Sequence, residues 1–314
     1  MSAIFTPENP GVLRLGTRGS PLALAQTGEL KSRLCEAHGM SADSIEIIPI
    51  KTSGDLIHNI PLIEAGGKGL FTKELDQALL DRSIDVAVHS AKDIPAVIEE
   101  KLEILGYLPR EDVRDAFISP FALHPKELPR GSTVGTASLR RGAMVKRLRP
   151  DLEITFLRGN VETRLSKIAH GEASATLLAL AGLKRLGLEA AATSVLNIDE
   201  FLPAPGQGAI AVAAHAGDEA VFSLLQPVLH PETAITLAAE RAFLRILDGS
   251  CRIPIGAHAR IEAGRLALRA IVLKPDGSRF FEASLTGSVS DAARLGQAAG
   301  LELAAKIPPG FFAF

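Results

Sequence analysis

The feature that most limits the possible folds of this chain is an alternation of short apolar segments with amphipathic helical segments through its first two thirds. Apolar runs at Val12–Leu15, Ile45–Ile50 and Ile84–Val88 have the length and composition of strands. One helix is predicted between them from Pro21 to about His38. A second helix is predicted by apolar residues that share one face: Phe71, Leu75, Ala78 and Leu79. Strands that alternate with helices in this way form an α/β domain with a largely parallel sheet.

The first predicted helix has clear start and stop signals. Ser20 is expected to be its N-cap, with Pro21 at the first helical position, because the missing N–H of proline has no intrahelical partner there. Gly39 is expected to end it.

A second unit repeats the alternation. Its predicted elements are a strand near Thr133, a helix from about Leu139, a strand Leu152–Leu157, a helix after Asn160, a strand Thr176–Leu180 and a short helix through Arg185. From Pro231 the pattern changes to a helix ending near Leu247, strands near Ala257–Ile261, Leu266–Leu273 and Arg279–Leu285, and a closing helix. This last part predicts an α+β domain. A chain of 314 residues also exceeds one ordinary hydrophobic core.

Composition and charge exclude several classes of protein. No apolar run approaches the roughly 20 residues that a membrane span needs, and the N-terminus does not resemble a secretory signal, so we expect a cytoplasmic protein without a membrane partner. The net charge of −2 argues against nucleic acid as a partner. The two cysteines, Cys35 and Cys251, form no disulfide framework or metal motif, so no metal is expected. Arginine exceeds lysine, 22 to 12, which favours an anionic ligand.

Polar residues follow the predicted strands where an α/β sheet binds its ligands. Carboxyl ends of parallel strands and helix N-termini meet at this edge. The residues expected there are Arg18, Ser20, His89, Ser90, Lys92 and Asp93 in the first unit and Ser138, Arg140, Arg141, Arg158, Arg164, Lys184 and Arg185 in the second. Two domains would then face each other with basic residues across a cleft, which suits a ligand with several carboxylates. Taken singly, each arginine is explained by solvation of a helix end, but first-turn arginines oppose the helix dipole and so favour an anion nearby.

Asp93 is an acid among these bases, in the run His89–Pro95. An ionised carboxylate there can accept hydrogen bonds from pyrrole N–H groups and stabilise positive charge on a ring. The alternative is a structural ion pair that holds Lys92 or an arginine in place.

Cys251 lies in the glycine-flanked loop Asp248–Gly256, beside Arg252. A thiol in such a loop can be accessible and have thiolate character, whereas Cys35 lies within a predicted helix and is expected to be inert packing. The alternative for Cys251 is a small buried apolar side chain.

Two glycine-rich segments fail as nucleotide motifs. Gly66–Gly69 lacks the first glycine and the Ser or Thr of a phosphate loop, and Gly206–Ala211 fits a dinucleotide pattern but does not open a βαβ unit. A nucleotide-dependent transferase would need a phosphate loop, and none is found in the sequence.

Taken together, eight segments resemble porphobilinogen deaminases in order and spacing over nearly the whole chain. They are Gly16–Ala23, Gly66–Phe71, His89–Pro95, Gly135–Arg141, Leu157–Val161, Ala181–Arg185, Pro205–Ala209 and the Cys251 loop. The resemblance implies two α/β domains like the lobes of a periplasmic binding protein, facing a cleft, and a small α+β C-terminal domain. We place these at residues 10–108 with 209–226, at 114–202, and at 231–314. Ala137, Ala173–Ser174 and Ser250 depart from the family's usual residues.

The resemblance also implies a reaction and a role for each site residue. Four porphobilinogens condense with loss of four ammonias to give hydroxymethylbilane, on a dipyrromethane cofactor that Cys251 holds by a thioether, and the enzyme is expected to be a monomer. Asp93 is the implied catalytic acid. The implied cofactor-binding residues are Cys251, Lys92, Ser138, Arg140, Arg141 and Arg158, and the implied substrate-binding residues are Arg18, Ser20, Phe71, Arg164 and Arg185. The alternative function is a cytoplasmic anion-binding module of the same two-lobed fold, which would carry no covalent cofactor.

Overall fold

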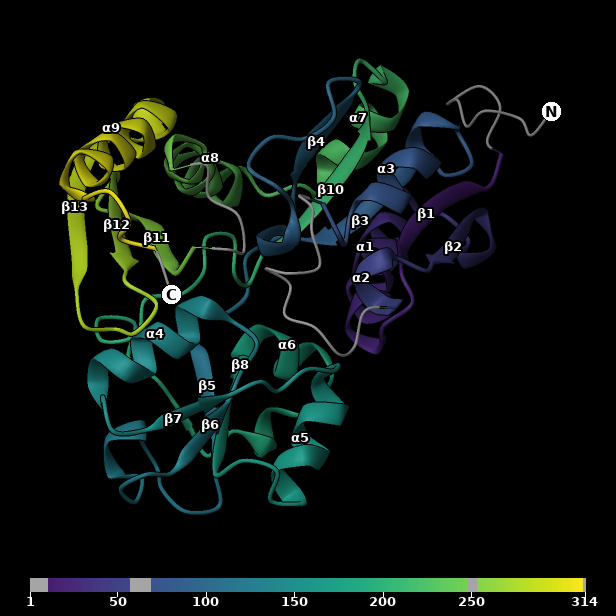
Figure 1. Ribbon diagram of the computed structural model, residues 1–314. Helices are drawn as coiled ribbons and strands as arrows, with labels where there is room; N and C mark the ends of the chain where they lie inside the picture. Colours follow the sequence, from purple (N-terminus) through teal and green to yellow (C-terminus); the bar gives the residue numbers. More distant parts are fainter. Residues whose placement is uncertain (1–10, 57–68, 248–252, 313–314) are drawn as a thin grey trace. The chain divides into compact units, whose positions relative to one another are not determined.

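A computed structural model describes residues 11–56, 69–247 and 253–312 (Figure 1). These residues form two compact units. The first unit comprises the described parts of Met1–Ile57, Gly67–Glu111 and Ala209–Ala234. The second comprises Asp112–Gly208 and the described parts of Ile235–Phe314. No helix among the described residues combines the length and the apolar character needed to cross a bilayer.

The first unit is built on a five-stranded sheet in the order β2-β1-β3-β10-β4. Its strands and main helices are β1 (Leu13–Arg18), α1 (Pro21–His38), β2 (Ile45–Ile50), α2 (Ser53–Leu56), α3 (Lys73–Leu80), β3 (Val86–Ser90), β4 (Leu102–Tyr107), β10 (Ile210–His215) and α7 (Glu219–Leu225). A 3₁₀ turn, η2 (Ala91–Asp93), follows β3. β1 pairs in parallel with β2 and β3, but β10 is antiparallel to both of its neighbours. The predicted largely parallel sheet is therefore correct for β2, β1 and β3, and wrong at β10, which enters from a distant part of the chain.

Helices cover both faces of this sheet. Leu30 and Leu34 of α1 are fully buried. They pack against Leu13 and Leu15 of β1 and against the face of β3 that carries Val86. On the opposite face Leu75 and Leu79 of α3 pack with Ala87 and Ala213. The two leucines of each helix are four residues apart, and Leu13 and Leu15 are two residues apart on β1. Side chains at these spacings point to the same side, so one face of each of these elements is apolar.

The boundaries of α1 are confirmed. The Ser20 side chain accepts a hydrogen bond from the main chain of Ala23, and Gly39 ends the helix with φ of 64°, a left-handed conformation that favours glycine. Phe71 differs from its prediction, because α3 begins at Lys73 and Phe71 precedes its N-cap Thr72.

The second unit contains a sheet of matching design, in the order β7-β6-β8-β5-β9. Its elements are β5 (Asp115–Ile118), β6 (Thr133–Gly135), α4 (Leu139–Leu148), β7 (Glu153–Thr155), α5 (Val161–Ala169), β8 (Ala175–Ala179), α6 (Leu180–Arg185) and β9 (Ser194–Val195). β6 pairs in parallel with β7 and β8, and β5 is antiparallel to β8 and β9. Strands β4, β5, β9 and β10 were missed; all four enter their sheets through antiparallel pairing, which the βα alternation does not predict.

The C-terminal part has its own three-stranded antiparallel sheet, β11-β12-β13 (Figure 1). Its elements are α8 (Pro231–Ile246), β11 (Ile255–Glu262), β12 (Arg265–Leu273), β13 (Phe280–Ser288) and α9 (Ala292–Lys306). Phe243 of α8 and Ala299 and Leu303 of α9 pack on its apolar face. The protein is therefore an α/β fold with a small α+β C-terminal region, as the sequence predicts.

Candidate active site

Arg18 and Asp93 lie together at one edge of the first sheet. Arg18 is the last residue of β1, and Asp93 lies in η2 directly after β3. Because β1 and β3 are parallel neighbours, their carboxyl ends meet at the same edge. Nη1 of Arg18 lies 3.9 Å from Oδ2 of Asp93, and the two side chains are 23% and 29% exposed, so both remain reachable by a ligand. The structure thus brings together an acid and a base that sequence reasoning placed at this edge.

Arg18 has two further partners. Its Nε lies 3.4 Å from Oδ2 of Asp55 and its Nη2 bonds the other oxygen of the same carboxylate. The guanidinium carbon lies 4.2 Å from the centre of the Phe71 ring, a cation–π contact. Burial raises the pKa of Asp55, but hydrogen bonds from Arg18 and Thr52 outweigh it and hold that pKa below its ordinary value. Asp55 was not predicted as a site residue.

Ser20 and Lys92 lie on either side of this pair in the chain. The Ser20 hydroxyl oxygen accepts the capping bond from the Ala23 N–H at 3.3 Å, so its own proton remains available to an acceptor. Lys92 is half-buried in η2, adjacent to Asp93.

His89 corrects one expectation. The sequence placed His89 and Ser90 after their strand, but β3 starts at Val86 and extends through Ser90, because antiparallel β10 continues the ladder to that residue. His89 is buried, and burial, with a smaller contribution from the Arg18 charge, lowers its pKa to about 4. His89 is therefore a neutral core side chain at neutral pH.

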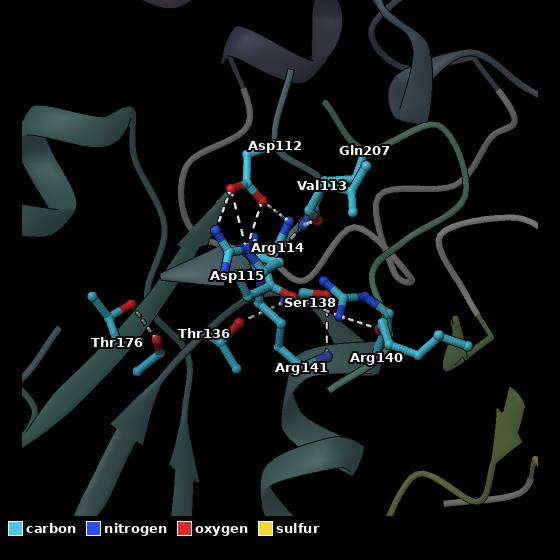
Figure 2. A network of polar contacts seen from close by, with 12 residues as sticks. Asp112, Val113, Arg114, Asp115, Thr136, Ser138, Arg140, Arg141, Thr176 and Gln207 are labelled. Carbon is cyan, nitrogen blue, oxygen red and sulfur yellow. Dashed lines mark hydrogen bonds and ion pairs between the residues drawn. The ribbon is translucent and has the colours of Figure 1, made fainter. Parts of the chain in front are cut away.

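In the second unit Arg140 and Arg141 converge on a buried acid, Asp115 (Figure 2). Nε and Nη2 of Arg141 donate to Oδ1 of Asp115 at 3.0 and 2.7 Å. Nη1 of Arg140 lies 2.8 Å from the other oxygen, Oδ2, and donates to the carbonyl of Leu202 at 2.8 Å. The first turn of α4 thus presents two cations whose charge is only half balanced by one carboxylate.

Burial and the two arginine charges act in opposite directions on the pKa of Asp115. Asp115 has no exposed surface, which by itself would raise its pKa, yet the charges of Arg140 and Arg141 outweigh burial and hold the pKa well below its usual range. Burial also lowers the pKa of Arg140. Nε of Arg140 is buried and donates no hydrogen bond within the described part of the chain, so the cluster retains an unsatisfied donor.

Two neighbours complete the cluster (Figure 2). Ser138 is the N-cap of α4, and its hydroxyl accepts from the Arg141 N–H at 3.4 Å. The side-chain amide of Gln207 donates to the Val113 carbonyl at 2.7 Å and to Asp115 at 3.2 Å. Gln207 belongs to the segment that matched a dinucleotide pattern, and in the structure it supports the arginine cluster instead.

The other predicted arginines lie around the same edge, each half-buried. Arg158 follows β7. Arg164, in the first turn of α5, donates from Nε to the Gly159 carbonyl at 2.8 Å. Arg185, at the end of α6, donates from Nη2 to the Gly208 carbonyl at 3.1 Å. These bonds to carbonyl oxygens help to orient the Arg164 and Arg185 side chains.

Cys251, with Ser250 and Arg252, lies outside the described residues. Cys35 is partly buried in α1 and packs beside the core, as expected of an inert thiol. Across residues 11–56, 69–247 and 253–312, no group of three or more His, Cys, Asp or Glu side chains is arranged to hold a metal ion.

Sequence reasoning missed Asp55 and Asp115 for different reasons. Asp55 follows β2 by a few residues, so the rule that located Arg18 after β1 applies to it as well. Asp115 begins β5, and the amino end of an antiparallel strand lies at the same edge as the carboxyl ends of its parallel neighbours. The register that pairs Asp115 with Ala179 at the end of β8 shows this directly.

Comparison with known families matches nearly all of the chain. Residues 13–223 match the family described as porphobilinogen deaminase, dipyrromethane cofactor binding domain, and residues 234–305 match the porphobilinogen deaminase C-terminal domain. The porphobilinogen deaminase of Nitrobacter winogradskyi is 54% identical over 95% of this chain and 94% of its own length. That of Nitrobacter hamburgensis is 53% identical over the same shares of both chains.

Solved structures give a weaker likeness. A periplasmic substrate-binding protein of an ABC transporter from Coxiella burnetii aligns with a TM-score of 0.43 at 13% identity, over 73% of this chain and 97% of its own. The second periplasmic VFT domain of Bordetella pertussis BvgS aligns with a TM-score of 0.40 at 19% identity, over 75% of this chain and 93% of its own.

Proposed function

The chain belongs to the porphobilinogen deaminase family, which polymerises porphobilinogen on a dipyrromethane cofactor in tetrapyrrole synthesis, and we propose how its own residues divide that work. Four porphobilinogens and one water give one hydroxymethylbilane and four ammonias, the water supplying the hydroxyl group when the tetrapyrrole is released. Each condensation forms a bond between the aminomethyl carbon of one unit and the free ring carbon of the preceding one. The amine leaves as ammonia and the ring carbon loses its proton.

Asp93 is the catalytic residue in this proposal. The observation that carries it is the position of Asp93 beside Arg18, with both side chains partly exposed at a ligand-binding edge. Positive charge develops on the pyrrole ring during condensation, and an ionised carboxylate that accepts from the ring N–H stabilises it. Arg18 and Ser20 would bind a carboxylate of the same unit, and Phe71 would pack over it.

The described residues fit a dipyrromethane. That group carries acetate and propionate carboxylates, and Arg140 and Arg141 present two guanidinium groups against one internal carboxylate, with the Arg140 Nε lacking an acceptor. Ser138, Arg158 and Lys92 would complete the binding set, and Cys251 would hold the group covalently. When bound, the dipyrromethane supplies the ring carbon to which the first porphobilinogen is joined. Arg164 and Arg185 would bind carboxylates of later units, because each added unit brings two more negative charges.

We further propose three domains, at residues 10–108 with 209–226, at 114–202 and at 231–314. Support comes from the separate sheet that each region has among the described residues. The enzyme would act as a cytoplasmic monomer without membrane or nucleic acid partners. The net charge of −2 supports the last of these points.

Product stoichiometry tests the proposed function. Purified protein supplied with porphobilinogen should release one ammonia for each porphobilinogen consumed and should form one hydroxymethylbilane for every four. Consumption of porphobilinogen without this ratio, or binding without ammonia release, would support the alternative of a non-catalytic anion-binding module.

A further inference from the structure

The guanidinium of Arg18 contacts two carboxylates, those of Asp55 and Asp93, and the proposed function gives Asp55 no role. Nε and Nη2 bond the two oxygens of Asp55, whereas Nη1 lies 3.9 Å from Asp93. The guanidinium carbon lies over the Phe71 ring. A guanidinium is planar and rigid, so fixing its Nε–Nη2 side also fixes the direction of Nη1.

Asp55 is itself firmly held. The hydroxyl of Thr52, a fully buried residue, donates to Oδ2 of Asp55 at 2.7 Å, and Asp55 lies in the short helix α2. The main chain of α2 is tied to the segment before α3, because the Gly54 N–H donates to the Leu70 carbonyl at 2.9 Å. The Ser53 N–H donates to Oε1 of Glu74 on α3, also at 2.9 Å.

Gly54 allows this turn to approach Phe71. A Cβ atom at Gly54 would collide with the Phe71 ring and with the Leu70 carbonyl oxygen. The ring that supports Arg18 and the turn that carries Asp55 are therefore packed directly against each other.

We propose that Asp55 is a positioning residue for porphobilinogen condensation: it holds Arg18 so that one terminal nitrogen stays beside Asp93 and faces the substrate. While Asp55 occupies the Nε–Nη2 side, the substrate carboxylate is bound at the Nη1 side, next to the catalytic acid. Asp55 thereby sets where the ring lies relative to Asp93. This inference rests on the proposed roles of Arg18 and Asp93.

A second arginine–aspartate pair in the same unit provides a matched control. Arg14, four residues earlier on β1, donates from Nε and Nη2 to the two oxygens of Asp85 at 3.1 and 2.7 Å. Asp85 also accepts from the Arg14 main-chain N–H, so this pair fastens β1 to the start of β3. The Arg14 pair has the same chemistry as the Arg18 pair without a contact to Asp93.

The groups that face Arg18 come from several elements, and all of them except Asp55 itself must be unchanged when Asp55 is substituted. They are Asp55 of α2, Phe71 before α3, Asp93 of η2 and the buried His89 of β3, whose pKa the Arg18 charge helps to lower. Substitution of Asp55 by Asn keeps the size of the side chain and its bond to Thr52. It removes the negative charge and places an amide NH2, in place of an acceptor oxygen, opposite Nη2 of Arg18.

Steady-state kinetics of the cofactor-loaded enzyme should be measured for Asp55→Asn, Asp55→Glu, Arg18→Gln, the Asp55→Asn/Arg18→Gln double variant and Asp85→Asn. Cofactor content by intact mass and the thermal midpoint should be measured on the same samples. Asp55→Asn should lower kcat/KM by about tenfold to a hundredfold, the usual effect of losing a charge-assisted hydrogen bond. The loss in Asp55→Asn should divide between kcat and KM in the same way as the loss in Arg18→Gln. The double variant should have a kcat/KM no lower than that of Arg18→Gln. Asp55→Glu should recover part of the loss.

Asp85→Asn should change the thermal midpoint and leave both kinetic constants at the wild-type level. The proposal is overturned if Asp55→Asn, like Asp85→Asn, leaves kcat and KM at the wild-type level. It is also overturned if the loss of kcat/KM in the double variant equals the product of the losses in Asp55→Asn and Arg18→Gln. If Arg18→Gln and Asp93→Asn themselves have full activity, the proposed function of this edge fails, which is a distinct result.

Discussion

Arg141 directs two nitrogens at a single oxygen of Asp115, an acid with no exposed surface. Arg140 reaches the other oxygen, so one carboxylate fixes two neighbouring cations at the start of α4. Cations in a first turn oppose the helix dipole, and Asp115 supplies the internal anion that makes them tolerable.

Asp115→Asn should therefore strongly destabilise the protein. Removing one member of a buried ion pair leaves uncompensated charge, and a loss of about 3–5 kcal/mol in the free energy of unfolding is expected, measured by urea denaturation. The variant should also carry less cofactor, because Arg140 and Arg141 lose their fixed orientation. Asp112→Asn is the control, since Asp112 makes a similar two-nitrogen pair with the exposed Arg114 and should change stability little. Equal effects of the two substitutions would contradict the importance of burial here.

His89 should make the protein sensitive to mild acid. Its pKa is about 4 in the folded protein and 6.5 when unperturbed, so between these values the unfolded state binds more protons. Stability from this group is present above pH 6.5 and is lost as the pH falls, by about 3 kcal/mol near pH 4. Urea denaturation of wild type and His89→Gln from pH 7.5 to 4.5 isolates this contribution, because other acids titrate in both. Parallel pH dependences would show that His89 does not cause it.

Asp93→Asn should uncouple cofactor content from turnover. The substitution preserves shape and removes the charge that stabilises the developing cation, so kcat should fall roughly 100-fold or more with normal cofactor content by intact mass. Turnover near the wild-type rate would assign Asp93 a structural role as an ion-pair partner.

The arginines should act at different stages of polymerisation. Arg140 and Arg158 variants should lose cofactor or first-substrate binding. Arg164→Gln and Arg185→Gln should instead accumulate partly extended chains, because in the proposed function these two arginines bind the carboxylates of the later units. Each lost bond should slow the affected step about tenfold to a hundredfold. Native mass spectrometry reads the distribution of chain lengths.

Arg260→Gln is the control for this series, because Arg260 pairs with Glu262 on the exposed side of β11. Its distribution should match wild type. A common distribution in the Arg140, Arg158, Arg164 and Arg185 variants would mean that these residues support the fold and do not act stepwise.

Local signals in the sequence predicted much of this fold. The limits of α1 are correct because Ser20 and Gly39 act through bonds within one turn. The end of β3 was placed too early because its last residues pair with β10, more than a hundred residues away in sequence. Long-range pairing of this kind has no local signature.

In the candidate site, too, local signals predicted some residues, and residues that depend on long-range contacts were missed. Arg18 and Asp93 were predicted at one edge, and the structure places them there, since position after a strand is a local property. Asp115 was missed because an acid that begins a strand resembles a surface acid until its partners are known. Its partner Gln207 is 92 residues away, in a glycine-rich segment that fits a dinucleotide pattern without opening a βαβ unit and that also carries the family resemblance.

Intact mass spectrometry of wild type and Cys251→Ser tests covalent, stepwise growth on Cys251 most directly. Wild type should exceed the mass of the bare polypeptide by one dipyrromethane, and limiting porphobilinogen should add a ladder spaced by one porphobilinogen less ammonia. Cys251→Ser should carry neither, since a hydroxyl is a poorer nucleophile than a thiol at neutral pH. Cys35→Ser should match wild type. A wild-type mass equal to the bare polypeptide, or adducts that persist in Cys251→Ser and vanish in Cys35→Ser, would contradict the account.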